Sequence, residues 1–194
     1  MIAGRSGVTQ GTPEKIMLGA GTVHRGLAYT AGTGWNFAES LVGATNGGST
    51  LTITPEFYQA AVDGVNIPIK ELTDKIGEKA ELATNFAEIS EEIIQATALA
   101  EILESDDDTK VLLESKANLS EGDFWENIAF VGKTLKGKEI IAILDNALCT
   151  SGLSLPGTNN EGAVVAATFG CYASIEQGNL DKLPWHIYYP KATV

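Results

Sequence analysis

The sequence predicts a mainly β protein (α+β), folded as a β-sandwich or partly open barrel with one flanking helix. Two observations favour this class. Most apolar segments are short, rich in β-branched residues and separated by Gly, Asn, Asp or Pro, and the chain contains 21 glycines, as expected for successive strands and turns. Only the segment that begins at Ser90 carries apolar residues at helical spacing.

The first fifty residues predict two strands followed by a long loop. Residues 15–18 and 22–30 have strand-like composition, whereas residues 31–50 contain five glycines and follow no clear period. Residues 1–14, which precede the first strand, are expected to form an extended N-terminal arm. The length of 194 residues suits one domain over residues 1–194.

A hairpin is predicted next. Residues 50–54 and 65–72 alternate between apolar and polar side chains, and the turn signal Asp63-Gly64 lies between them. We expect these two segments to pair, and residues 77–89 to form a further strand.

The predicted helix runs from Ser90 to Leu103. Ser90 is a favourable N-cap, and Glu91 and Glu92 occupy the first turn, where the helix dipole favours negative charge. Its apolar stripe should lie along a sheet. The stripe consists of Ile93, Ile94, Ala98, Leu99, Ile102 and Leu103.

The second half of the chain predicts strands at residues 110–117, 124–135, 139–155, 163–175 and 185–189. Residues 139–175 are expected to form one long antiparallel hairpin around a polar turn at 156–162. Cys149 and Cys171 then lie nearly opposite each other. Two cysteines are too few for a disulfide framework, so we expect buried thiols.

The charge balance disfavours a generic nucleic-acid binder. The chain has 13 basic and 25 acidic side chains and a net charge of −12, whereas affinity for nucleic acid comes chiefly from Lys and Arg. No segment approaches the roughly 18 to 20 apolar residues that span a bilayer, and no secretory signal is recognisable. We therefore expect a soluble protein that is made and retained in the cytosol.

The sequence predicts no enzyme, cofactor or metal. The glycines at 19, 21 and 26 do not have the spacing of a phosphate-binding loop, and a strand-like segment follows them. His24 and His186 are the only histidines, and neither lies in a hydrolase or zincin motif. The acidic run at 106–108 lacks the Gly and Glu of an EF-hand loop.

Eight local strings follow one another along nearly the whole chain. They are Gly43-Ala44-Thr45-Asn46-Gly47-Gly48, Pro55-Glu56-Phe57, Val62-Asp63-Gly64, Glu121-Gly122-Asp123, Asn127-Ile128-Ala129-Phe130-Val131-Gly132, Asn146-Ala147-Leu148-Cys149, Glu161-Gly162-Ala163 and Leu183-Pro184-Trp185-His186-Ile187-Tyr188-Tyr189-Pro190. In order and spacing the chain resembles the major tail proteins, or tail tube proteins, of long-tailed, non-contractile phages and prophages of Gram-positive hosts. Each string is structural rather than chemical.

The resemblance implies a tail-tube β-sandwich that assembles as stacked hexameric rings. The tube would conduct the genome, and its partners would be further copies, the tape measure protein and the tail terminator and initiator proteins. Double-stranded DNA would pass through without adhering, and the protein would reside in the virion tail after assembly in the host cytoplasm. The family's inter-ring loop matches residues 31–50 here.

Within that loop, the resemblance assigns ring stacking to Trp35, Asn36, Phe37, Leu41 and Val42. Aromatic anchors flanked by Gly and Asn suit a loop that orders on assembly. The alternative is that Trp35 and Phe37 pack on their own domain.

A lumen to which DNA does not adhere should carry carboxylates, because they repel phosphate groups. The candidates are Glu56, Asp63, Glu71 and Glu139, which lie on or beside predicted strands. The alternative is that they face solvent on the outer wall.

Three rival functions stay open. A monomeric carbohydrate-binding or host-surface-binding module would use Trp35, Trp125 and Trp185 as an aromatic platform. An acid–base enzyme would need paired carboxylates with a partner that the sequence does not show. The inner-tube protein of contractile tails or secretion systems shares the expected fold.

Overall fold

The computed structural model describes residues 7–157, 159, 162–178 and 180–191, and within these ranges the chain is mainly β. The strands are β1 Met17–His24, β2 Tyr29–Thr30, β3 Gly34–Trp35, β4 Thr45–Gln59, β5 Thr73–Phe86, β6 Ala100–Leu103, β7 Leu112–Ser115, β8 Trp125–Thr134, β9 Glu139–Cys149, β10 Val165–Cys171 and β11 Trp185–Tyr188. The helices are α1 Phe37–Ser40 and α2 Glu91–Ala98, with 3-10 turns at Thr12–Glu14, Lys70–Leu72, Glu121–Asp123 and Ile175–Gln177. The mainly β prediction is confirmed.

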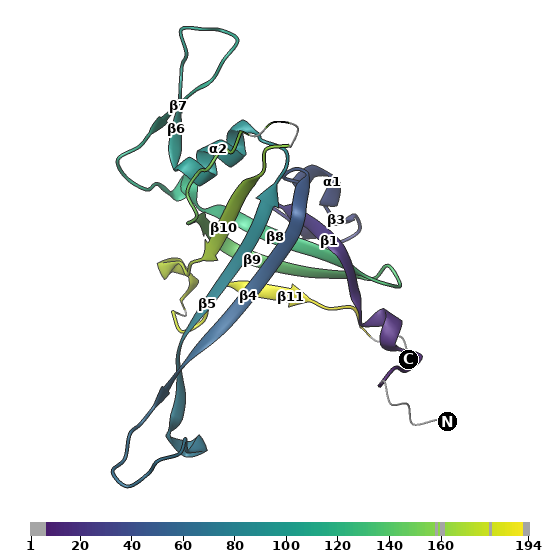
Figure 1. Cartoon of the computed structure of the whole chain (residues 1–194), viewed down its shortest axis with the longest axis vertical. Coiled ribbons are helices and arrows are strands. Elements are labelled where there is room, and N and C mark those ends of the chain that lie inside the picture. Colours follow the sequence, from purple (N-terminus) through teal and green to yellow (C-terminus); the bar gives the residue numbers. More distant parts are fainter. Residues whose placement is uncertain (1–6, 158, 160–161, 179, 192–194) are drawn as a thin grey trace.

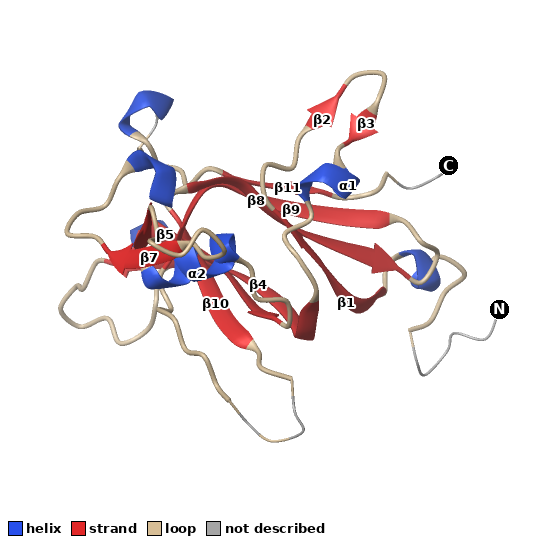
Figure 2. Ribbon diagram, turned by 90° about the horizontal axis from the view of Figure 1, so that it is seen from above, coloured by secondary structure: helices blue, strands red, loops and turns tan. Residues whose placement is uncertain are grey.

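Seven of the described strands form one antiparallel sheet in the order β1-β8-β9-β10-β5-β4, and β11 also pairs with β9. The sheet curls so that β10, β5 and β4 form one layer over β1, β8, β9 and β11 (Figures 1 and 2). The two edge strands approach each other at one end, where the Val42 N–H donates to the Val23 carbonyl at 3.1 Å. The result is a partly closed half-barrel.

The main core fills the space between the two layers. Its largest buried side chains include Phe86, Phe169, Leu82 and Ile128, and helix α2 adds Ile93 from one end. A second cluster lies on the opposite face of β8 and β9, beneath the β2–β3 hairpin and α1. Its members are Leu27, Ala129, Val131, Ile141 and Ile143, with Trp35 and Phe37 packed against them.

The predicted helix is too long at its C-terminal end. Ser90 caps it as expected, accepting a hydrogen bond from the Ile93 N–H at 3.3 Å. The helix stops at Ala98, because Leu99 adopts the left-handed conformation with φ 50° and ψ 53°. Residues 100–103 form β6 and pair with β7, since their apolar residues find strand partners across the acidic turn.

The predicted hairpin has a different second strand. Strand β4 begins at Thr45 and pairs with β5, so residues 65–72 are not a strand but part of a loop that ends in a 3-10 turn. Pro68 has no N–H to donate to a sheet, which disfavours a strand there. Because Thr45 pairs with Phe86, the predicted long loop ends at residue 44 rather than 50, and β3 and α1 lie within it.

The remaining strands agree with the prediction to within a few residues, with two exceptions. The early strands merge into β1, whose register is interrupted between Leu18 and Thr22. In the expected hairpin of residues 139–175, the two strands pair only over residues 147–149 and 169–171. There Cys149 pairs with Phe169, and Cys171 pairs with Ala147. Both thiols are free and buried. Of the predicted N-terminal arm, residues 1–6 lie outside the described residues.

Candidate assembly surfaces

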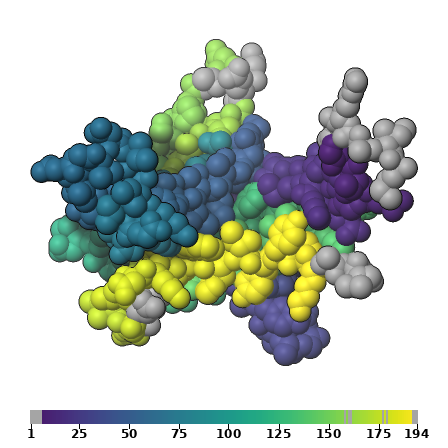
Figure 3. Space-filling view, turned by 90° about the horizontal axis from the view of Figure 1, so that it is seen from below, coloured from purple at the N-terminus to yellow at the C-terminus, as the bar shows by residue number. Residues whose placement is uncertain are grey.

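The most prominent projection is the far part of the β4–β5 hairpin, which we call the arm (residues 55–77). It extends beyond the sheet as a two-stranded ribbon that ends in the loop of residues 60–72 (Figures 1 and 3). Phe57, Tyr58 and Ile76 are 61%, 57% and 66% exposed on it. Consecutive Phe57 and Tyr58 place aromatic rings on both faces of the ribbon. The sequence analysis missed this surface, although an aromatic pair within an alternating strand is a readable signal.

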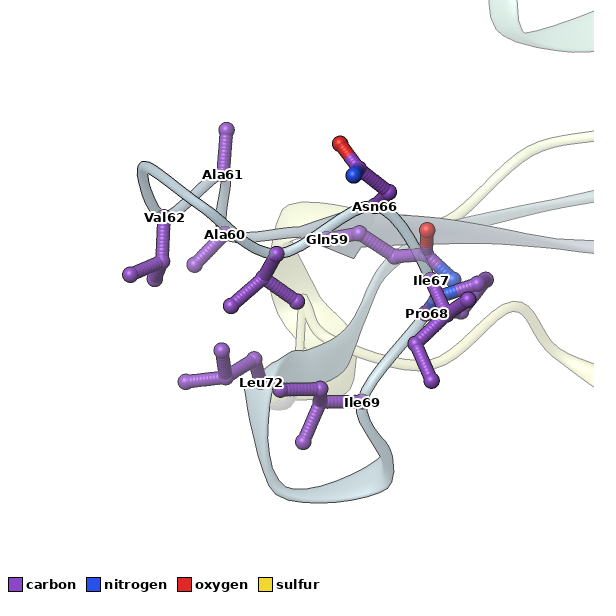
Figure 4. A pocket seen from close by; sticks show the side chains of 10 residues that line it. Gln59, Ala60, Ala61, Val62, Asn66, Ile67, Pro68, Ile69 and Leu72 are labelled. Carbon is purple, nitrogen blue, oxygen red and sulfur yellow. The ribbon is translucent and has the colours of Figure 1, made fainter.

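The arm's loop folds around a hollow of about 370 Å³. Figure 4 shows the side chains around it, with the amide of Asn66 pointing away from Ile69 and Leu72. Ile67 and Val62 of the same loop are exposed. The end of the arm is therefore apolar as well, which is unusual for a projecting loop in contact with water.

The residues predicted to stack rings are folded onto their own sheet. Trp35 and Phe37 are half-buried against the second cluster, and the ring centroids of Trp35 and Tyr188 are 4.9 Å apart. Val42 packs against the main core, whereas Leu41 is exposed. These five residues lie in one region, and a role in contact between rings stays a prediction.

Asn36 holds this region in place through its side chain. Its Oδ1 accepts from the Ala28 N–H at 2.8 Å, and its Nδ2 donates to the Gly26 carbonyl at 3.2 Å. The Asn36 side chain thus supplies hydrogen bonds to main-chain groups that the short β2–β3 hairpin leaves without strand partners.

The four predicted lumen carboxylates do not converge. Glu56 lies on β4, whereas Asp63 and Glu71 lie in the loop of the arm. Glu139 begins β9 at the other end of the sheet, with its Oε1 3.8 Å from Lys133 Nζ. No common lining surface includes all four.

The outer face of the β10–β5–β4 layer shows one pattern that the sequence analysis did not single out. Its outward positions carry mostly small, polar or neutral side chains, which are Thr50, Thr52, Thr54, Ala83, Asn85, Ala166 and Thr168. Charge on this face comes from Glu56, Lys79 and Glu81, and a Lys79–Glu81 ion pair of 2.8 Å raises the pKa of the lysine. The face is nearly neutral with a slight acidic excess.

The tryptophans do not form an aromatic platform. Trp125 is 3% exposed, and its ring centroid lies 4.9 Å from that of Phe169 in the core. The guanidinium of Arg25 lies over the Trp125 ring. Trp35 and Trp185 are half-buried. The surface on which the binding-module alternative depended is therefore not present.

The buried titratable side chains His24 and Cys171 lie within the fold rather than at an open site. His24 is buried, with Nδ1 2.9 Å from Ser40 Oγ and Nε2 2.8 Å from Thr22 Oγ1, and burial lowers its pKa. Burial also raises the pKa of Cys171 to about 12, so this thiol is a poor nucleophile at neutral pH. Among the described residues, no group of three or more His, Cys, Asp or Glu could hold a metal ion.

Within the described ranges, no helix is long and apolar enough to cross a membrane. Comparison with known proteins found no matching family model and no matching curated protein.

Proposed function

We propose that this chain is a structural subunit that assembles into stacked hexameric rings and forms the tail tube of a long-tailed phage, the conduit for its genome. The observation that carries the proposal is the arm, which extends apolar side chains away from the sheet. The order of the tail-tube strings along the sequence and the mainly β fold also support it. The partners would be further copies, the tape measure protein and the terminator and initiator proteins, and the location the virion tail.

The exposed apolar area on the arm gives assembly a driving force. Burying a phenylalanine side chain fully contributes about 1.5–3 kcal/mol, so covering the 61% of Phe57 that is exposed contributes about 1–2 kcal/mol. Tyr58 and Ile76 offer similar areas. A second copy that covers the arm would bury all three, and the same contact would recur at every subunit.

The outer face of the β10–β5–β4 layer suits the wall of the conduit. Its threonine and alanine side chains present little charge, and the acidic excess from Glu56 and Glu81 disfavours phosphate binding. DNA would then meet a surface with no cluster of cations to hold it. Of the predicted lumen residues, Glu56 is the one on this face, and Glu81 joins it.

The arm can be tested by substitution. The double variant Phe57→Ser/Ile76→Ser removes two exposed apolar side chains and leaves the buried core unchanged. We expect it to fold like the wild type but to raise the concentration needed for tube assembly by about thirtyfold or more, since the two side chains together contribute about 2–4 kcal/mol to each contact. Sedimentation velocity measures the assembled fraction, and a thermal melt measures folding.

The matched control is Gln59→Ser/Lys70→Ser, which changes two exposed polar residues of the same arm. It should assemble like the wild type. Normal tubes from the Phe57→Ser/Ile76→Ser variant would contradict the role given to the arm.

A further inference from the structure

The β6–β7 hairpin projects from the body at the opposite side from β1 (Figures 1 and 2), and its apolar residues are only partly covered by the described part of the chain. Ile102 and Leu113 face each other across the ribbon, as do Leu103 and Leu112, so apolar side chains lie on both faces. Ile102, Leu103 and Leu112 are exposed, as is Val111 beside them. A two-stranded hairpin is marginally stable in water by itself, so this ribbon gains if another surface covers it.

The same hairpin is strongly acidic. Residues 100–115 contain six acidic side chains and one lysine, with Asp106, Asp107 and Asp108 in the turn. Asp107 is paired with Lys110 and Thr109, and the hydrogen bonds from Lys110 and then Thr109 lower its pKa. The hairpin therefore presents an apolar ribbon with a negative end.

A surface of the opposite kind lies where β1 begins beside the β8–β9 turn, and we call it the basic end (residues 14–18 and 133–139). The Leu135 N–H donates to the Ile16 carbonyl at 3.0 Å, and Lys138 Nζ lies 3.2 Å from Glu14 Oε2, which ties the two segments together. The basic end has four lysines and two glutamates in a chain of net charge −12. Its exposed apolar side chains are Ile16, Met17, Leu18 and Leu135.

Both surfaces are apolar in part, and their charges are opposite. They lie on separate sides of the molecule, with β7 at one side of Figure 2 and β1 at the other. Both also have strand edges without a ladder partner among the described strands, since β6 and β7 pair with each other and β1 ends the large sheet. Only the far end of β1, at Val23 and His24, is bonded to residues 41–42. Two unlike surfaces on one subunit join copies head to tail, which gives a ring when the rotation closes.

We propose that the β6–β7 hairpin of one copy docks on the basic end of the next copy, and that this contact joins neighbours within a ring. The proposal deepens the proposed function and rests on it for the closed ring. The occupant is a second copy because the hairpin of this same chain is both acidic and apolar and so complements the basic end in both respects. A polyanion would contact its lysines and leave its apolar side chains in water.

The first variant reverses the charge of the hairpin with Glu104→Lys, Asp106→Lys and Asp108→Lys. Two positive surfaces would then meet, and we expect the concentration needed for association to rise by about tenfold or more. The matched control, Glu121→Lys/Glu126→Lys/Glu176→Lys, changes the net charge equally at exposed positions elsewhere. It should associate like the wild type.

The second variant reverses the basic end with Lys15→Glu, Lys133→Glu and Lys136→Glu, and it should fail alone for the same reason. An equimolar mixture of the two variants restores opposite charges at every contact, in alternating order around the ring. We expect the mixture to assemble, and a chain that carries all six substitutions to assemble by itself. Circular dichroism checks the fold, and sedimentation velocity with negative-stain electron microscopy measures assembly.

The outcomes separate this contact from the tube itself. Two outcomes would overturn the contact and leave the tube proposal standing. In the first, each of the two charge-reversed variants still forms rings like the wild type. In the second, both variants fold but their mixture stays monomeric. Wild-type chains that join head to tail into open filaments, with the same loss and rescue, would support the contact and overturn the ring. A wild type that is monomeric at every concentration would overturn both.

Discussion

Removing the carboxylate of Asp123 tests how the β6–β7 hairpin is attached to the large sheet. Asp123 ends the 3-10 turn before β8, and Lys116 follows β7 directly, so their ion pair joins the two ends of the connecting segment. The side chains are 6% and 14% exposed. Asp123 Oδ2 also accepts hydrogen bonds from the Ser120 N–H at 2.7 Å and the Ser120 hydroxyl at 3.2 Å.

The variant Asp123→Ala leaves the Lys116 ammonium nearly buried without its counter-ion. Breaking a buried pair from one side costs about 3–5 kcal/mol, and the slight exposure of Lys116 favours the lower end of that range. For a domain of this size each kcal/mol lowers Tm by about 2–4 °C, so we expect a fall of about 6–12 °C. The matched control is Glu121→Ala, an exposed residue of the same turn that should melt with the wild type.

The same pair predicts a dependence on pH. Burial by itself would raise the pKa of Asp123, but the hydrogen bonds from Lys116 and Ser120 outweigh it and hold the pKa below the unfolded value of 3.8. A carboxyl whose folded pKa is lowered stabilises the fold above its unfolded pKa, and the stability is lost as pH falls through the folded value. Thermal melts between pH 7 and pH 2 should show a loss below about pH 4 that Asp123→Asn lacks. An Asp123→Ala Tm within about 2 °C of the wild type would refute the buried-pair account.

Three further predictions concern the sheet and its buried groups. Gly21→Ala should destabilise the fold by about 2–4 kcal/mol, because Gly21 has φ +70° and an added Cβ would meet the Phe130 ring; Gly26→Ala, at φ +66° in open space, should cost only the backbone strain. Since burial lowers the pKa of His24, stability should decline as pH falls below the unfolded value of 6.5, and chemical denaturation of His24→Gln should show a flatter profile. A thiol reagent at pH 7.5 should label Cys171 only after unfolding, and rapid labelling of the native protein would contradict its burial.

The strands and the helix start were readable because local chemistry determines them. The Ser90 cap acts through its own first turn, and the alternation of residues 50–54 reports a face of β4 directly. The helix end was not readable in the same way. Residues 100–103 carry apolar side chains that fit either a helix or a strand, and the choice depends on pairing with β7, a contact across the acidic turn.

The candidate surfaces were harder to predict than the strands, because exposure depends on the whole fold. The resemblance assigned Trp35 and Phe37 to ring stacking, with packing on their own domain as the alternative, and the second cluster on β8 and β9 covers part of each ring. Phe57 and Ile76 lay outside the predicted strands, and they are exposed because the hairpin runs past the last strand that could cover it. Tertiary position, not residue type, decides which apolar side chain is free to contact a second copy.

Negative-stain electron microscopy of the purified full chain across a concentration series, with light scattering alongside, tests the central claim that this chain is a tube subunit. The account predicts hollow tubes or six-fold rings that increase with concentration, with scattering that rises in step. Particles that stay monomeric throughout the series, in the presence of an intact fold by circular dichroism, would contradict it.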